Sequence, residues 1–487
     1  MTRFSKILYF TVVFIGLTVI YSLIARNILP NSDSATGMLE GRDVAEGNIF
    51  LHDWNLSTVS FYFTEIIWYA LATKIVGYGA WQSYVVPSML YSALVLSSYN
   101  LSKKHGRFIA WPMLIAFAAP GTFAAARVLI PIIHIGTYVY VVICYTILFE
   151  YEKNRKKSLL IPYIFLSAIT LFSDDISLYI LIAPVIISFS FKLYKERNKD
   201  CVIVITSCIS ACVLSKIISF IFKYNNGFFL PGIPGLKFNE LDKITESIYL
   251  FIDGTIQFFN ANIFGEFIFS VNSIFSLIAL CMMFVFFAQV ISCYRNVKKS
   301  DTTTLALAIT SFIMVPAYLL SDRAEDLYTI RYVVPFFIFG SILISRESKT
   351  KKTVHNLLII PAVITCLYFY PGFKETSKHD NDTIVKLRNE IKLNKLSDGY
   401  GPFWFASSVA INGDISIAPI AKLNPDEFGP FMWLSKNDWY RRGGNFFIVD
   451  GKDLDIITKK YGNPIKTISI DDKLIVVYDK NITFNYN

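Results

Sequence analysis

The stretch NSDSATGMLEGRDVAEGNIFLHDWNLS, residues 31–57, decides how the fold of this chain is predicted. It follows a first apolar segment, residues 6–26, and carries five carboxylates: Asp33, Glu40, Asp43, Glu46 and Asp53. Charge is scarce elsewhere, because only 17% of the 487 residues are charged, against roughly 25% in soluble domains. An acidic stretch between apolar segments must lie in water, so the first question is which side of a membrane it faces.

The composition indicates a membrane protein. Hydrophobic residues make up 54% of the chain and the mean hydropathy is +0.46, so the long apolar runs need a bilayer as their solvent. The net charge of +9 would suggest nucleic acid in a soluble protein. Here Lys and Arg gather in short clusters between apolar runs, which is the pattern of the positive-inside rule, so we expect no nucleic-acid partner.

About eleven segments are predicted as transmembrane helices. They are residues 6–26, 82–101, 108–126, 129–149, 159–172, 176–191, 202–222, 271–293, 303–320, 332–345 and 356–370. The first is predicted to be retained, because no small-residue cleavage site follows it. Residues 61–76 are apolar and aromatic but carry Glu65 and Lys74, so we expect a surface helix within an outer loop of residues 27–79.

Loop charges predict the orientation. The basic clusters lie at the N-terminus and in alternate loops, at residues 103–107, 153–157, 192–199, 295–299 and 346–352. The positive-inside rule places all of them in the cytoplasm. Every acidic connection then lies outside, at residues 31–57, 173–175, 223–270 and 321–331. The prediction is a multi-pass protein of the cell (plasma or inner) membrane with a cytoplasmic N-terminus.

The last part of the chain has the composition of a soluble domain. We therefore predict two units, a transmembrane domain over residues 1–371 and a small extracytoplasmic α/β domain over residues 372–487. Alternation predicts strands at 414–420, 445–449, 466–470 and 473–478, and helical periodicity predicts helices at 382–393 and 452–461.

Asp33 is the first candidate for chemistry. It comes just after Pro30 at the predicted membrane boundary, and a carboxylate there can act as a general base or help to hold a divalent cation, Mg²⁺ or Mn²⁺. The plain alternative is a set of solvated loop acids. Trp54 and Tyr62 follow as candidate contacts for a sugar or acceptor, with a membrane-interface aromatic belt as the alternative. Further candidate acids are Asp53, Glu40, Asp43, Asp174 and Asp175.

Arg331 is the leading candidate for binding a phosphate, because it opens a predicted span from the outside and a guanidinium binds phosphate in bidentate fashion. The alternative is an ion pair with Glu325 or Asp326. Arg127 is a weaker candidate of the same kind. The pair Asp174-Asp175 lies between two spans, where it is either functional or a helix N-cap.

Other chemistries find little support. His52 and His134 have no companion His or Cys cluster, so zinc is not expected. The Gly/Pro-rich residues 227–235 are not followed by Gly-Lys-Ser/Thr, so they are not a phosphate-binding P-loop, and no Ser-His-Asp signature is found. A cytoplasmic enzyme that consumes nucleotides is therefore disfavoured.

Short motifs complete the pattern: PNSD at 30–33, FYF at 61–63, SDD at 173–175, RYVVP at 331–335, GYGPFW at 399–404 and YGNP at 461–464. With an outward acidic loop after the first helix, many spans and an outward α/β domain, the chain resembles the GT-C class of polytopic glycosyltransferases. The resemblance implies a polyprenyl-phosphate sugar donor and a glycan, lipid or protein acceptor. It implies Asp33 as catalytic base, Asp174 or Asp175 as a second acid, and Arg331 at the lipid phosphate. The first loop lacks the adjacent Asp-Glu or Asp-x-Asp pair of some branches, so no cofactor is certain.

Three rival functions remain open at this point. A transporter or flippase for a lipid-linked glycan would need charges within several spans, and Lys216 is the only clear one. A polymerase or ligase of surface polysaccharide would rely on Arg and His in a large outer loop, whereas the first loop here is acidic. A non-enzymatic assembly protein would use the C-terminal domain to bind a partner.

Overall fold

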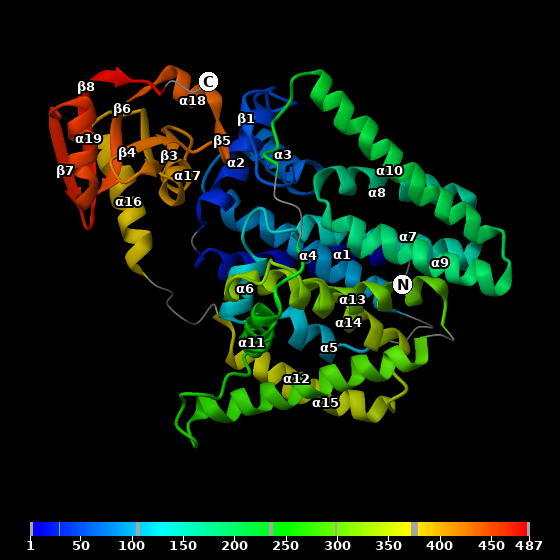
Figure 1. Ribbon diagram of the computed structural model, residues 1–487. Coiled ribbons are helices and arrows are strands. Elements are labelled where there is room, and N and C mark those ends of the chain that lie inside the picture. Colours follow the sequence, from blue (N-terminus) through cyan, green and yellow to red (C-terminus); the bar gives the residue numbers. More distant parts are fainter. Residues whose placement is uncertain are drawn as a thin grey trace.

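Helices account for most of the architecture. The computed structural model describes residues 3–28, 30–103, 108–232, 237–297, 300–371 and 378–484. The helices of the larger part are α1 (Arg3–Ala25), α2 (Ser32–Ala45), η1 (Tyr62–Ile66), α3 (Ile67–Val76), α4 (Gln82–Ser102), α5 (Trp111–Met113), η2 (Leu114–Ala118), α6 (Thr122–Val128), α7 (Ile135–Asn154), η3 (Lys157–Leu159), α8 (Leu160–Ser173), η4 (Leu178–Ile182), α9 (Ala183–Glu196), α10 (Asp200–Tyr224), α11 (Leu241–Phe258), α12 (Val271–Asn296), α13 (Thr302–Leu320), η6 (Leu327–Val333), α14 (Val334–Glu347) and α15 (Lys352–Tyr368). Figure 1 shows these helices running roughly side by side, with a small sheet at one end of the assembly.

Six of the described helices are long and apolar enough to cross a membrane. They are Phe4–Ala25, Leu178–Glu196, Asp200–Tyr224, Val271–Asn296, Thr302–Leu320 and Leu327–Glu347. Two shorter apolar helices, Lys157–Ser173 and Lys352–Tyr368, accompany them. Of the eleven predicted spans, ten overlap a helix of the structure, with ends that differ by up to six residues.

The predicted span at residues 108–126 is wrong. Three short pieces, α5, η2 and α6, stand there instead of one helix. Pro112 begins the first piece, and Pro120 with Gly121 separates the second from the third. Proline lacks the N–H that a helix interior needs and its ring clashes with the preceding turn, so a continuous apolar run does not become a continuous helix.

The acidic stretch also differs from its prediction as a loop. Fourteen of its residues form α2, which Asn31 caps by accepting a hydrogen bond from Ser34 N (3.0 Å). Gly37 and Gly41 favoured a loop in the sequence, but both lie where α2 touches its neighbours. A Cβ on Gly41 would lie 2.4 Å from Tyr69 Cβ, and one on Gly37 would lie 2.2 Å from Ile132 Cγ1. These glycines allow a close helix contact, which a sequence pattern does not distinguish from a turn.

A third difference lies in the long outer connection, residues 223–270. It contains the helix α11, which was not predicted. Its exposed face includes Leu241, Tyr249 and Ile252, and its buried face includes Leu250 and Phe258. The sequence of α11 does alternate charged and apolar residues with helical periodicity, so the signal for this helix was present and was overlooked.

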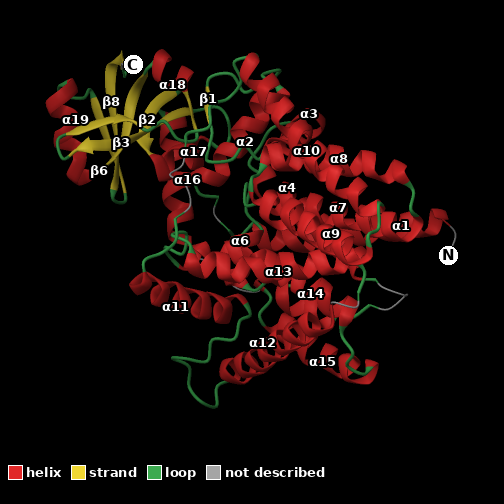
Figure 2. Cartoon of the chain, turned by 45° about the vertical axis from the view of Figure 1, so that its right-hand side comes forward, coloured by secondary structure: helices red, strands yellow, loops and turns green. Residues whose placement is uncertain are grey.

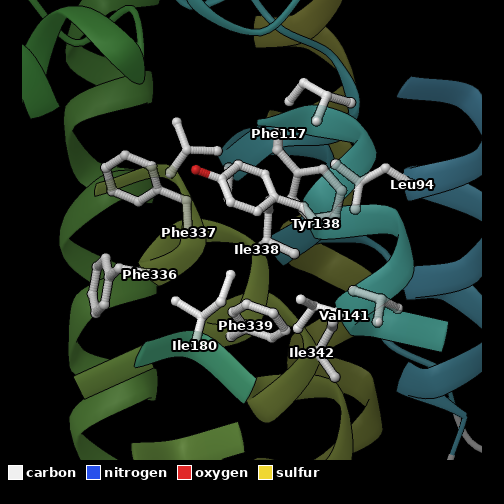
Figure 3. Close-up of a cluster of buried hydrophobic side chains, with 14 of the residues drawn as sticks. Leu94, Phe117, Tyr138, Val141, Ile180, Phe336, Phe337, Ile338, Phe339 and Ile342 are labelled. Carbon is white, nitrogen blue, oxygen red and sulfur yellow. The ribbon is translucent and has the colours of Figure 1, made fainter. Parts of the chain in front are cut away.

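The helix α14 is the centre of the larger core. Every residue from Val334 to Arg346 is buried, while most of the lipid-length helix α1 is not. Figure 3 shows Phe337, Phe339 and Ile342 of α14 packed with Tyr138 and Val141 of α7. Arg331 lies in η6, directly before α14, and is therefore held next to a rigid, fully packed helix.

The C-terminal part is a six-stranded mixed sheet with helices. Its elements are α16 (Lys378–Leu393), β2 (Asp398–Pro402), α17 (Phe403–Ala410), β3 (Ser416–Asn424), β4 (Glu427–Pro430), β5 (Ser435–Lys436), α18 (Asn437–Arg442), β6 (Gly444–Asp450), η8 (Gly451–Asp453), α19 (Leu454–Tyr461), β7 (Lys466–Ile470) and β8 (Lys473–Ile482). The strand order is β4-β3-β2-β6-β8-β7, and β2 pairs in parallel with both β3 and β6.

The predicted α/β character of this part is confirmed. All four predicted strands correspond to β3, β6, β7 and β8, and both predicted helices correspond to α16 and α19. The strand β2 was missed because its sequence, DGYGP, contains two glycines and a proline. The predicted boundary between residues 371 and 372 meets residues 372–377, which lie outside the described part, so the division into two units stays a prediction.

One short sheet connects the acidic stretch to the C-terminal part. The strand β1 (Trp54–Asn55) pairs antiparallel with β5, in the register Trp54–Lys436 and Asn55–Ser435. Figures 1 and 2 both show α2, β1 and α17 side by side at the junction between the helices and the sheet. The stretch quoted at the start is thus the element on which the two parts meet.

Candidate active site

Asp33 lies in the first turn of α2, beyond the end of α1. Its side chain is partly buried, and within the described part of the chain it makes no ion pair. Burial raises the pKa of the Asp33 carboxyl above its ordinary value, and the positive charge of Arg331 lowers it in part. Asp33 is therefore a carboxylate that faces a cation from another part of the chain and still has free acceptor capacity.

Arg331 comes from η6, the short helix that leads into α14. The Asp326 side chain accepts a hydrogen bond from Thr329 N (3.0 Å) and so caps this helix. The guanidinium carbon of Arg331 lies 4.2 Å from the centre of the Tyr328 ring, and Nη2 donates to the Tyr332 hydroxyl (3.3 Å). Its Nε is buried without a partner among the described residues. The alternative ion pair with Glu325 or Asp326 is not formed within that part.

Arg127 meets Arg331 at the same tyrosine. Its guanidinium carbon lies 3.4 Å from the centre of the Phe123 ring and 5.6 Å from that of Tyr328. Its Nε donates to Leu327 O (3.4 Å) at the start of η6. The two arginines that the sequence singled out separately therefore flank Tyr328, and together they make a positive region beside Asp33.

Behind this region lies a buried polar centre around Asp174. The Asp174 carboxylate is 1% exposed, lies 2.6 Å from His134 Nδ1 and accepts a hydrogen bond from Thr137 Oγ1 (2.7 Å). It also accepts from Ile176 N (3.2 Å), as an N-cap would. The contact with Ile176 N thus supports the interpretation of Asp174 as an N-cap, and the contacts with His134 and Thr137 fit a functional acid. Asp175 points the other way, since its side chain is exposed.

The His134 ring links this centre to the arginine region. Its centroid lies 6.1 Å from that of Tyr332, which accepts the hydrogen bond from Arg331, and 5.0 Å from that of Phe61. His134 has a positive φ of 70° directly before α7. Sequence reasoning considered His134 only as a metal ligand and missed this position, because its partners come from distant segments.

Glu65 is a second buried acid that the sequence did not identify as part of the site. Its carboxylate accepts from Ile133 N (3.3 Å) and Gly136 N (3.4 Å) around the N-terminus of α7. Burial raises the pKa of Glu65 to about 7, while His134 and the two backbone N–H groups oppose the rise. The available signal was an acid inside an otherwise apolar and aromatic segment.

Two further acids of residues 31–57, Asp43 and Asp53, connect α2 and its loop to the C-terminal part. Asp43 accepts hydrogen bonds from Lys436 Nζ (2.6 Å) and Trp54 Nε1 (2.8 Å). Asp53 pairs with Arg441 (2.7 Å). Glu40 is 2% exposed, and burial raises its pKa to about 8, with the nearby Asp43 adding to the rise. Asp43 and Asp53 are thus held by residues of the C-terminal part, whereas Glu40 is enclosed and its Oε1 has no partner among the described residues.

The predicted sugar contacts Trp54 and Tyr62 are both 2% exposed. The Trp54 ring packs against Trp439 (5.3 Å between centroids) and its N–H binds Asp43. The Tyr62 hydroxyl donates to Ile49 O (2.6 Å), and its ring contacts Phe222. Their surfaces are used inside the protein, so this structure gives them no free face for a sugar.

The described residues contain no group of three or more His, Cys, Asp or Glu side chains that could hold a metal ion. The ligand set for Mg²⁺ or Mn²⁺ would have to be completed by a substrate phosphate.

Comparisons with known proteins support the architecture. No family model and no curated protein sequence matches the chain. Among solved structures, it is similar to ArnT from Cupriavidus metallidurans bound to undecaprenyl phosphate, with a TM-score of 0.57, 10% sequence identity and 98% of each chain covered. The likeness extends over the whole chain, so the chain has the fold of the polytopic GT-C membrane glycosyltransferases and is a multi-pass membrane protein.

Proposed function

We propose that this protein is a membrane glycosyltransferase that moves a sugar from a polyprenyl-phosphate donor to an extracytoplasmic acceptor, with Asp33 as the general base. The fold supports the class of enzyme, and the bound undecaprenyl phosphate of ArnT supports a lipid-linked donor. Loop charge supports an orientation in which the N-terminus is cytoplasmic and the site faces outward.

The observation that carries this proposal is that Arg331 lies near enough to Asp33 to lower the pKa of its carboxyl, although the two side chains form no ion pair in the described part of the chain. A partly buried carboxylate at the water-facing end of the helices faces a guanidinium at the start of a membrane-length helix. A lipid phosphate at the membrane boundary would meet Arg331, and an acceptor arriving from water would meet Asp33. In this arrangement Arg331 would bind the phosphate on one side of the donor sugar, and Asp33 would meet the acceptor on the other side.

The reaction follows from these two groups. Asp33 takes the proton of an acceptor hydroxyl or amine while the acceptor atom attacks the anomeric carbon of the donor sugar. The bond between that carbon and the phosphate oxygen breaks, and its electron pair stays on the departing polyprenyl phosphate. Arg331, assisted by Arg127, stabilises the charge that develops there.

The test is sugar transfer by purified protein in lipid vesicles, with a panel of polyprenyl-phosphate hexoses as donors. We expect Asp33→Asn to lower kcat by about 10²–10⁴-fold, the usual contribution of a general base, and to leave the melting temperature near that of the wild type. Glu46→Gln is the matched control, because Glu46 is an exposed acid at the other end of α2 that pairs with Arg42. Full transfer by Asp33→Asn would refute the general-base role.

The same vesicles separate the rival functions. A transporter, a flippase or a polymerase of lipid-linked polysaccharide would leave the donor's sugar–phosphate bond intact or consume a preassembled glycan. If the wild type moves intact donor across the vesicle and releases no polyprenyl phosphate, and Asp33→Asn does so at the same rate, the transporter is the better assignment.

A further inference from the structure

The helix α11 has three faces of different chemistry. Buried residues form the face that packs on the protein, and they include Ser247, Leu250, Gly254 and Phe258. Acidic residues form the second face, at the helical spacing of Asp242, Glu246 and Asp253. Exposed apolar residues form the third, at the spacing of Leu241, Ile248 and Ile252. An exposed apolar face on a helix that already has a packed face marks a surface for an apolar partner.

The turn that follows α11 is apolar and exposed as well. Four large side chains within six residues are between 74% and 93% exposed: Phe264, Phe267, Ile268 and Phe269. Hydrogen bonds hold this turn on the start of α12, because Phe267 O accepts from Ser273 Oγ (2.5 Å) and from Ser270 N (2.9 Å). Figures 1 and 2 both show the turn projecting beyond the end of α12. The phenylalanines are therefore presented outward by an ordered element.

The helix α12 indicates what surrounds this turn. It is one of the membrane-length helices. Its exposed stripe is apolar along its length and includes Val271, Ile274, Leu277, Cys281, Phe284 and Ala288. In a multi-pass membrane protein, the acyl chains of the bilayer cover such a stripe. Phe269 precedes Val271 by two residues, so the lipid-facing surface of α12 continues directly into the turn.

The helix α11 lies across the membrane-length helices rather than along them. Figure 1 looks nearly along the axis of α11, whereas α12 runs across the picture. A helix that lies in the membrane interface buries an apolar face among the lipids and turns a charged face to water. The third face of α11 and its acidic face match these two requirements.

The packed face of α11 contacts the helix that carries Arg331. A Cβ on Gly254 would lie 2.9 Å from Ile330 Cγ1, and Ile330 directly precedes Arg331 in η6. The Phe258 ring stacks on Phe337 of α14 (4.7 Å between centroids). Because α11 and η6 pack this closely, the depth of α11 in a membrane also sets the depth of Arg331.

We propose that α11 and residues 264–269 form a membrane-binding surface, which contacts the acyl chains of the leaflet on the side of Asp33 and Arg331. The partner is a lipid surface, because the turn continues the lipid-facing stripe of α12 and α11 has the faces of an interfacial helix. This surface places Arg331 at the boundary between headgroups and acyl chains, where lipid phosphates lie.

The experiment maps lipid contact in the full chain. The protein is placed in vesicles of phosphatidylethanolamine and phosphatidylglycerol with radiolabelled acyl chains, and the photoreactive p-benzoylphenylalanine replaces one residue at a time. Phe284 in the stripe of α12 is the lipid-facing reference, and Leu423 of β3, which is also exposed, is the water-facing one. On irradiation we expect lipid label at Phe267 and at Ile252 to exceed that at Leu423 by about tenfold and to approach that at Phe284.

Glu246 is the matched control within α11, because it is exposed on the acidic face. Its label should stay near that of Leu423. Label at Phe267 and Ile252 no higher than at Leu423 would overturn the inference, as would equal label at Ile252 and Glu246. Crosslinked dimers in place of lipid adducts would also overturn it, since a second copy would then cover this surface. If the Ile252 variant fails to fold, Phe267, which lies outside the helix, still decides the question.

The consequence for Arg331 rests on the proposed function and has its own measurement. Phe267→Asp combined with Phe269→Asp should raise the KM for a polyprenyl-phosphate hexose in vesicles about tenfold and leave kcat unchanged, because both charges oppose burial among lipids. Leu423→Asp is the control. A wild-type KM would refute the link between this surface and Arg331. If the wild type transfers sugar from no donor, the proposed function fails, while the labelling pattern still decides whether the surface binds lipid.

Discussion

The two ends of α2 use charge in different ways. At its N-terminal end, Asp33 makes no ion pair with the described residues, and the positive charge of Arg331 lowers the pKa of its carboxyl in part. At its C-terminal end, Arg42 pairs with Glu46 and Asp43 holds Lys436 and Trp54 at hydrogen-bond distance. Acids of one short stretch thus split between an open site and a closed junction. The difference shows that the role of a carboxylate depends on which cation lies near it. It also depends on whether its oxygen atoms are still free to accept a hydrogen bond.

After Asp33→Asn, the largest effect is expected from the loss of Arg331. Arg331→Gln should raise the KM for donor about 10–100-fold, because a charge-assisted contact to phosphate contributes about 1.5–3 kcal/mol. It should also shift the acidic limb of the kcat/KM profile. Asp33 acts in its ionised form, and Arg331 lowers the pKa of Asp33, so loss of the cation raises that pKa and moves the limb to higher pH. Steady-state kinetics over pH measure both effects.

Arg331→Lys is the control for this prediction. It retains the positive charge but not the planar fork, so the limb should stay near its wild-type position while donor binding weakens. An acidic limb that does not move in Arg331→Gln would mean that Asp33 and Arg331 are not coupled in the working enzyme.

A smaller effect is expected from the loss of Asp43 near the C-terminal end of α2. Asp43→Asn should reduce stability by about 1–3 kcal/mol, because Lys436 and the Trp54 N–H lose their charged acceptor. Transfer should fall far less than in Asp33→Asn. The measurements are thermal melting in detergent and the rate of proteolysis around residue 372. Lys436→Met should have a similar effect, and the double variant should be less than additive, since both remove one contact.

The smallest effect on transfer is expected from the substitution Glu40→Gln in the middle of α2. Glu40 has a pKa raised from 4.5 to about 8, so between these values the folded protein holds a proton that the unfolded chain releases. Stability from this group therefore falls as pH rises from about 4.5 to 8 and is flat above it. Glu40→Gln should reduce the loss of melting temperature across that interval. Glu65 contributes a slope of the same sign, so the comparison is made between the variant and the wild type.

Much of the fold was predictable from patterns that are local. Ten of the eleven apolar runs predicted as spans correspond to helices, and alternation located four strands of the sheet, because both signals depend on neighbouring residues in the chain. The exceptions are equally physical. Pro120 ends a helix inside an apolar run, and Gly37 and Gly41 permit a close contact of α2 that resembles a loop in sequence.

The candidate site was predictable only as a set of separate residues. Asp33 and Arg331 were singled out for their positions after and before an apolar segment. Their mutual influence, and the meeting of Arg331 with Arg127 at Tyr328, became visible only in the structure. His134 was dismissed for want of a sequence neighbour, yet it lies 2.6 Å from Asp174.

The sequence by itself determined that this is a multi-pass membrane chain with a mixed α/β end and an acidic stretch after its first helix, because solvent preference is a property of each segment. Only the tertiary structure decided which acids are free to act. In the sequence, Asp43, Asp53 and Glu40 cannot be told apart from Asp33. In the structure, Asp43 and Asp53 pair with residues hundreds of positions away, and Glu40 is enclosed by the packing around α2. Contacts over such separations depend on how the helices and the sheet pack, as the contacts of α2 with the C-terminal part illustrate.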